Sequence, residues 1–156
     1  MEVKTYQSAP LWRRFAAILY DSFLVLALIF LAGFINLGIQ IAIYGEALLH
    51  EMTEQGYSLG GVPFYLGLIV IIYGFFGFFW TRSGQTLGMK AWRLSIVGQN
   101  GQAITPAKSL TRFLMAIPSL GLVGLGVFWM LLDPKQRSWQ DMASSSQTIL
   151  LPKAKQ

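Results

Sequence analysis

The chain has 156 residues, of which 54% are hydrophobic and only 12% are charged, and its formal net charge is +5. In soluble domains about a quarter of all residues are charged, so this composition argues against a soluble protein. The length is sufficient for one domain but not for two, and we expect a single membrane domain over residues 1–156.

Several classes of function are excluded by residue types. The basic residues do not form a stripe with interleaved aromatic side chains, so we expect no nucleic acid partner. The chain has no cysteine and a single histidine, His50, so no thiolate or His-rich metal site is expected. Nothing resembles a nucleophile–base arrangement. We therefore expect no enzyme activity, no cofactor and no metal.

The first apolar segment begins in the sequence "WRRFAAILYDSFLVLALIF", residues 12–30. It continues to about residue 44, which is longer than the ~20 residues that a bilayer requires. The segment is too long for the h-region of a signal peptide and no A-x-A-like site follows it, so we interpret residues 15–44 as an uncleaved first span. Asp21 lies inside this apolar run.

A polar loop and a second span follow. Residues 45–61 contain three glutamates and no lysine or arginine. Residues 62–80 contain no charged residue, and Pro63 is compatible with the first turn of a helix. This pattern predicts a second membrane-spanning helix over residues 62–80.

The connector at residues 81–112 is polar and basic. Its "RLSIV" at 93–97 alternates as a strand does, and Asn100-Gly101 favours a type I′ turn, so we expect a hairpin over about 93–105. Thr105 and Pro106 then predict the N-cap and first residue of a helix.

The connector also contains "GQTLGMK" at 84–90, which differs from the phosphate-binding loop G-x-x-x-x-G-K-[ST]. We interpret its two glycines as a tight exit turn after the second span. This turn would bring Gln85 and Thr86 beneath the spans.

A third apolar run covers residues 112–133. Pro118 and the glycines at 121, 124 and 126 weaken a helix there. We favour two short half-helices that meet near residues 119–124 and return to the same side of the membrane, although about 20 apolar residues are also long enough to cross.

The distribution of lysine and arginine indicates the orientation in the membrane. The N-terminal arm contains three, the first loop none, the connector five and the C-terminal tail four. The positive-inside rule therefore predicts that the arm, the connector and both termini are cytoplasmic. The basic residues would contact anionic head groups of the lipid bilayer, which is the expected partner.

Three segments resemble the RDD family of prokaryotic integral membrane proteins. "RRFAAILYD" has an arginine followed seven residues later by an aspartate, here Arg14 and Asp21. "RSGQTLGMKAWRLSIVGQNGQAIT" is similar to the central segment of the family. "DPKQRSWQDMASSSQTIL" is similar to its closing segment, in which Asp141 is the second family aspartate and Ser-rich sequence replaces a more usual small-residue-Gly-Thr ending. The resemblance implies a location in the prokaryotic cytoplasmic membrane and a role in transport of unidentified ligands or ions.

Asp21 has two interpretations. As an ionisable residue at membrane depth it is a candidate proton, ion or ligand site, together with Arg14 about 10 Å away on the same helix face. Alternatively, Arg82, Gln85, Thr86 or backbone N–H groups hold Asp21, and it only fixes the register of the helices.

The tail strand "QTILL" at 147–151 is expected to pair with residues 93–97 and complete a three-stranded sheet, since open strand edges are usually covered. Asp141 would then cap a helix or turn and lie within reach of Arg14.

Together these features predict an all-α membrane protein with two full spans, a third re-entrant or spanning segment and a small cytoplasmic β element. The leading hypothesis is transport of an ion or small ligand through a polar site of Arg14, Asp21 and Asp141. The alternative is a non-transporting adaptor or assembly subunit. Two spans enclose no pore, so we expect self-association or another membrane protein as partner.

Overall fold

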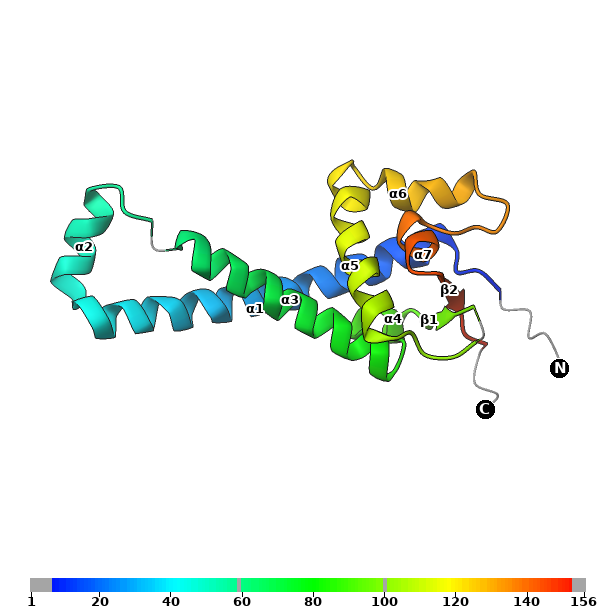
Figure 1. Cartoon of the computed structure of the whole chain (residues 1–156), viewed down its shortest axis with the longest axis horizontal. Coiled ribbons are helices and arrows are strands. Elements are labelled where there is room, and N and C mark those ends of the chain that lie inside the picture. Colours follow the sequence, from blue (N-terminus) through cyan, green and yellow to red (C-terminus); the bar gives the residue numbers. More distant parts are fainter. Residues whose placement is uncertain (1–6, 59, 100, 153–156) are drawn as a thin grey trace. The chain divides into compact units, whose positions relative to one another are not determined.

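The computed structural model describes residues 7–58, 60–99 and 101–152. These residues form two compact units. Unit 1 contains the residues up to 22 and those from 73 onwards, and unit 2 contains residues 23–72. Figure 1 shows the order of the elements along the chain.

Two long helices, α1 (Leu11–Tyr44) and α3 (Gly61–Arg82), are apolar enough to cross a membrane. Their most apolar segments have mean hydropathies of 2.4 and 2.1. The two predicted spans are therefore confirmed, with ends that differ by a few residues. In α1, the Pro10 carbonyl accepts the first helical N–H groups, so the helix starts before the apolar run does.

Unit 2 consists of most of α1, the short helix α2 (Glu46–Glu54) and the first half of α3. The sequence predicted a polar loop where α2 lies. Gly45 ends α1 with a φ of 77°, a backbone conformation that favours glycine. Large apolar side chains such as Phe34 and Val62 are each 71% exposed, as expected for helices surrounded by lipid.

Unit 1 contains an antiparallel sheet of β1 (Leu94–Gly98) and β2 (Ser146–Leu150). Leu94 lies opposite Leu150 and Gly98 lies opposite Ser146. The predicted pairing of the tail with the connector strand is therefore confirmed. The N-terminal arm covers the other edge of β2, where Ala9 N–H donates to the Thr148 carbonyl at 3.1 Å.

The predicted three-stranded sheet is wrong in its third strand. Asn100 lies outside the described residues, and residues 101–105 form no strand. A hydrogen bond from Gly98 N–H to the Gln102 carbonyl closes a turn after β1. The edge of β1 that a hairpin partner would use is occupied, because Ile96 N–H donates to Gly84 and the Leu94 carbonyl accepts from the Gln85 side chain.

The hydrophobic core of unit 1 lies around the sheet and the adjacent helix ends. Leu94 and Ile96 of β1 pack with Trp80 of α3 and with Met89 of α4 (Leu87–Ala91). Thr86 is the N-cap of α4 and accepts the Met89 N–H. The helix α4 and strand β1 are thereby held against the start of α1 and the end of α3.

The third apolar run forms α5 (Pro106–Gly121), α6 (Leu125–Phe128) and the 3₁₀ helix η1 (Trp129–Leu131). Thr105 caps α5 and Pro106 is its first residue, as predicted. The helix continues through Pro118 to Gly121, and the break between α5 and α6 lies within the predicted range of 119–124, where Val123 and Gly124 have φ values of 55° and 77°. The two helical pieces are bent by 105°.

Candidate functional site

Asp141 lies in α7 (Trp139–Ala143) and is completely buried. Its N–H donates to the hydroxyl of the N-cap residue Ser138 at 3.3 Å, and its carboxylate accepts the Ser138 N–H at 3.1 Å. This reciprocal capping box satisfies two N–H groups at the helix start. The predicted capping role of Asp141 is confirmed, and α7 holds the carboxylate in one orientation.

Two arginines bind the two oxygens of this carboxylate. Nη1 of Arg14, in α1, lies 2.6 Å from Oδ2, and Nη1 of Arg112, in α5, lies 2.7 Å from Oδ1. Only 6% and 9% of the two arginine side chains are exposed. The predicted Arg14–Asp141 pair is confirmed, and Arg112 is a partner that the sequence analysis did not identify.

Backbone carbonyls take up the remaining donors of Arg14. Its Nε donates to the Ala9 carbonyl at 3.1 Å, and its Nη2 donates to the carbonyls of Thr148 at 3.1 Å and Gln136 at 3.3 Å. These acceptors lie in the N-terminal arm, in β2 and in the turn before α7. Arg14 therefore joins the start of α1 to the N-terminal arm, to β2 and to the turn before α7. A lysine, with one point charge, could not bind all three segments.

Side chains of β2 bind Arg112. Its Nη1 donates to the Ser146 hydroxyl and its Nη2 donates to the Thr148 hydroxyl, both at 2.8 Å. The Thr148 hydroxyl donates in turn to Asp141 at 2.9 Å. The guanidinium also lies 5.6 Å from the centre of the Trp80 ring, a cation–π contact. We refer to Arg14, Arg112, Asp141, Ser146 and Thr148 as the Asp141 cluster.

The charge of the Asp141 cluster is fixed by its two cations. Burial alone would raise the pKa of Asp141, but the charges of Arg112 and Arg14 and the hydrogen bonds that they donate hold this pKa well below its ordinary value. The carboxyl group is therefore ionised at neutral pH, and the cluster contains two positive charges and one negative charge.

Asp21 lies on α1 and is also buried, with 5% of the residue exposed. Its Oδ1 accepts the N–H of Gly88 at 2.9 Å and its Oδ2 accepts the Thr86 hydroxyl at 2.5 Å. Gly88 is required for this approach, because a Cβ there would collide with the Ala17 carbonyl and lie 2.9 Å from Asp21 Cγ. Asp21 thus binds the start of α4.

Of the three predicted supporting residues, only Thr86 contacts Asp21. The Gln85 amide donates to the Leu94 carbonyl, and Arg82 is exposed, with its guanidinium 5.7 Å from the centre of the Phe78 ring. Within residues 7–58, 60–99 and 101–152, no ion pair involves Asp21. Asp21 and Arg14 therefore belong to separate sets of contacts on the same helix.

A sequence signal for Arg112 existed. Ser109, Arg112 and Ser119 are all buried on one side of α5. Polar residues at such helical spacing within an apolar segment indicate a buried polar face. In the distribution of charges along the chain, Arg112 is one of the five cations of the connector.

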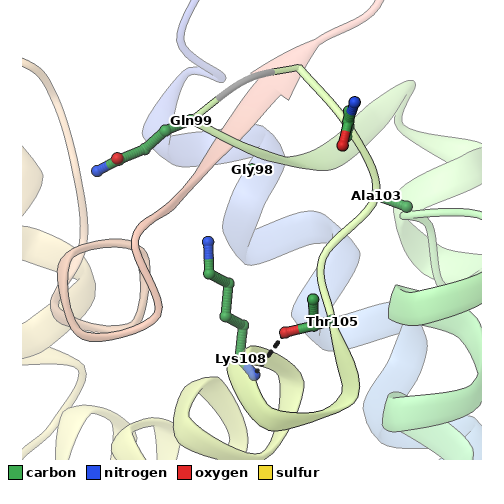
Figure 2. Close-up of a pocket in the computed structure, with 6 residues that line it drawn as sticks. Gly98, Gln99, Ala103, Thr105 and Lys108 are labelled. Carbon is green, nitrogen blue, oxygen red and sulfur yellow. Dashed lines mark hydrogen bonds between the residues drawn. The ribbon is translucent and has the colours of Figure 1, made fainter.

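A small polar cavity of about 160 Å³ lies between the turn after β1 and the start of α5 (Figure 2). The Lys108 side chain extends from the first turn of α5 toward this turn. Its lining residues are Gly98, Gln99, Gln102, Ala103, Thr105 and Lys108, none of which is a predicted site residue.

The comparison with known families decides the classification. The model of the RDD family matches residues 8–145, which include Arg14, Asp21, Arg112 and Asp141. The chain belongs to the RDD family. Proteins of the RDD family are membrane proteins, in agreement with the two apolar helices. Searches among curated proteins and among solved structures found no match.

Proposed function

We propose that this RDD protein is part of an assembly that transports an ion or proton, and that Asp21 takes up the transported ion. The contrast between two buried aspartates carries this proposal. Two arginines pair with Asp141, whereas among the residues that the structure describes Asp21 accepts hydrogen bonds only from a hydroxyl group and a backbone N–H. An ionisable residue inside a membrane-spanning helix is a functional-site candidate by default.

The surroundings of Asp21 accommodate both the carboxylate and the carboxylic acid. The Thr86 hydroxyl can donate to the ionised form or accept from the protonated form, since a hydroxyl group does both. The Gly88 N–H binds the other oxygen in either case. Asp141 instead faces two guanidinium groups and the Ser138 N–H, which only donate, and the Thr148 hydroxyl, which already accepts a hydrogen bond from Arg112. Proton or cation uptake therefore fits Asp21 better than Asp141.

Arg14 has an indirect part in this proposal. It lies two helical turns before Asp21 and binds Asp141, so it fixes the start of α1. Asp141 and Arg112 complete this anchor. The anchor would hold α1 in place while the contact between Asp21 and α4 forms and breaks.

We further propose that the chain lies in a prokaryotic cytoplasmic membrane with its arm, connector and tail on the cytoplasmic side. The positions of the lysine and arginine residues support this orientation. The hydrogen bonds of β2 with the N-terminal arm and with β1 support a common side for all three segments. Two crossing helices enclose no pathway, so transport would involve several copies or another membrane protein.

A non-transporting adaptor or assembly subunit is the second candidate. The same two bonds support it, because Thr86 and Gly88 satisfy both oxygens of Asp21 and hold α4 against α1. In that case the charge of Asp21 has a structural role only.

Flux measurements in proteoliposomes test the two candidates. We expect purified protein to carry H⁺, Na⁺ or K⁺ down an imposed gradient, and Asp21→Asn to fold normally and lose this flux. Asp133→Asn is the matched control, because Asp133 lies outside α1 and α3 and pairs with Arg137. Wild-type flux in Asp21→Asn would remove Asp21 from the mechanism. No flux of wild-type protein under any of the three gradients would favour the adaptor.

A further inference from the structure

The strands that precede and follow the third apolar segment pair with each other. Strand β1 precedes α5 and strand β2 follows η1 and α7, and the two strands pair over five residues. A complete crossing by residues 106–131 would separate β1 from β2 by a hydrocarbon layer of about 30 Å. Hydrogen-bonded strands are only about 5 Å apart, so the segment must begin and end on one side.

Helix α5 has a polar face and an apolar face. Ser109, Arg112 and Ser119 are buried on one side of the helix, where Arg112 binds Asp141 of α7 and Thr148 of β2. Successive residues of a helix are rotated by about 100°, which places Leu110, Leu114 and Ile117 on the opposite face. These three side chains are 42%, 54% and 58% exposed.

The direction of α5 differs from that of a crossing helix. Its first half packs on α3, where the rings of Phe113 and Tyr73 are 5.4 Å apart. The segment then reaches the start of α1, where the rings of Phe128 and Phe15 are 5.3 Å apart. Within unit 1, α5 runs across the direction of the first turns of α1 (Figure 1).

We propose that α5 lies in the plane of the membrane, in the leaflet on the side of the sheet, and is not part of a third crossing. Its apolar face, Leu110, Leu114 and Ile117, would contact the acyl chains of that leaflet. The bend of 105° after α5 then turns α6 and η1 back toward the sheet. An amphipathic helix that binds one leaflet in this way lies at the boundary of head groups and acyl chains.

The charge of unit 1 complements anionic head groups at that boundary. Its described residues include nine lysines and arginines but only three aspartates. All three aspartates are engaged in internal contacts, Asp21 with Thr86 and Gly88, Asp133 with Arg137, and Asp141 with two arginines. The cations Arg82, Lys90 and Lys135 remain exposed. Unit 1 therefore carries an excess of positive charge, which favours a surface of anionic head groups.

Depth measurements with spin labels test the proposal, and the chain has no cysteine that would interfere. Leu110→Cys and Ile117→Cys are labelled and reconstituted in nanodiscs of phosphatidylethanolamine and phosphatidylglycerol. Val62→Cys and Ile69→Cys on α3 form the matched control, because they have the same separation of seven residues and are also exposed. A helix that crosses the membrane changes depth by about 10 Å over seven residues.

We expect the depths at 62 and 69 to differ by about 10 Å and those at 110 and 117 to differ by less than about 3 Å. Leu114→Cys provides a third label on the same face and should have the same depth as the other two. A difference between 110 and 117 equal to that in α3 would overturn the proposal.

A second measurement uses Val123, which is 89% exposed at the end of α5. In oriented vesicles, Val123→Cys should not react with an impermeant maleimide added to the side from which Glu51→Cys reacts. A reaction from that side would show that the end of α5 reaches the opposite surface of the membrane, and it would overturn the proposal. Neither experiment depends on flux, so its result is independent of whether the protein transports an ion.

Discussion

Arg112 Nη1 lies 2.7 Å from Asp141 Oδ1, while Arg14 binds the other oxygen of the same carboxylate. One aspartate thus pairs with two arginines that come from different helices, α5 and α1. Hydrogen bonds between charged groups are stronger than those between neutral groups. The loss of one arginine leaves the other paired, whereas the loss of the Asp141 charge leaves both arginines buried without a counter-charge.

The first prediction concerns the charge of Asp141. Asp141→Asn keeps the size of the side chain but removes its charge, and we expect it to reduce the free energy of unfolding by about 3–5 kcal/mol. Chemical unfolding of the protein in detergent micelles measures this change. Asp133→Asn, which affects a partly exposed pair with Arg137, should have a much smaller effect.

A second substitution tests whether the loss comes from stranded charges. Adding Arg112→Met to Asp141→Asn removes one unpaired cation and should restore part of the lost stability, since a buried charge is then replaced by an apolar side chain. Wild-type stability of Asp141→Asn would contradict the assigned role of the carboxylate.

The second prediction concerns acid. The pKa of Asp141 is held below its ordinary value by two arginines, and that of Asp133 is lowered to about 2 by Arg137. Unfolded aspartate has a pKa of about 3.9. A folded pKa below this value means that the unfolded chain binds the proton more readily, so the two groups stabilise the fold above pH ~4 and this contribution is lost as the pH falls further.

The free energy of unfolding measured against pH tests this expectation. The contribution of these two groups to the free energy of unfolding should stay constant from neutral pH to about pH 4 and should decrease at lower pH. The Asp133→Asn variant should still lose stability in acid, because the contribution of Asp141 remains. An acid profile of Asp133→Asn that is flat below pH ~4 would show that Asp141 has no lowered pKa.

The third prediction concerns the contact between α4 and α1. In Gly88→Ala the new methyl group would meet the Ala17 carbonyl and the Asp21 side chain, and backbone atoms cannot move aside as a flexible side chain can. We expect a loss of about 1–3 kcal/mol in the free energy of unfolding and a weakened bond between Gly88 and Asp21.

Gly74→Ala is the matched control, because a Cβ added at Gly74 in α3 meets no atom within 4 Å. It should be neutral or stabilise the helix by about 0.5–1 kcal/mol. Equal stability of the two alanine variants would mean that α4 does not approach α1 closely enough to require glycine.

Much of the fold follows from local patterns in the sequence. The lengths of the two apolar runs predict α1 and α3, and Thr105-Pro106 predicts the start of α5, since these signals depend on neighbouring residues only. The pairing of β2 with β1 followed from an open strand edge. Helix α2 was missed, because Gly45 ends α1 and starts a new helix within a polar segment that has no strong apolar period.

The sites were predicted less completely than the fold. Arg14 and Asp141 were expected to meet, because the tail strand brings them to the same end of the molecule. Arg112 was missed, since its position in the sequence is also that of an ordinary flanking cation and only the three-dimensional contacts distinguish the two. The partner of Asp21 could not be chosen from the sequence, because Arg82, Gln85 and Thr86 all lie within a few residues of the exit turn.

The separation of Arg14 and Asp141 along the chain has a consequence for biosynthesis. The two residues are 127 positions apart. At roughly 5–20 residues per second, about 6–25 s of translation separate them. During this interval α1, α3 and α5 are made while Arg14 has no carboxylate partner, whereas Arg112 precedes Asp141 by only 29 positions. The contact between the start of α1 and α7 therefore forms only after Asp141 has left the ribosome, and a partner that binds the unfinished arm would have to do so within these seconds.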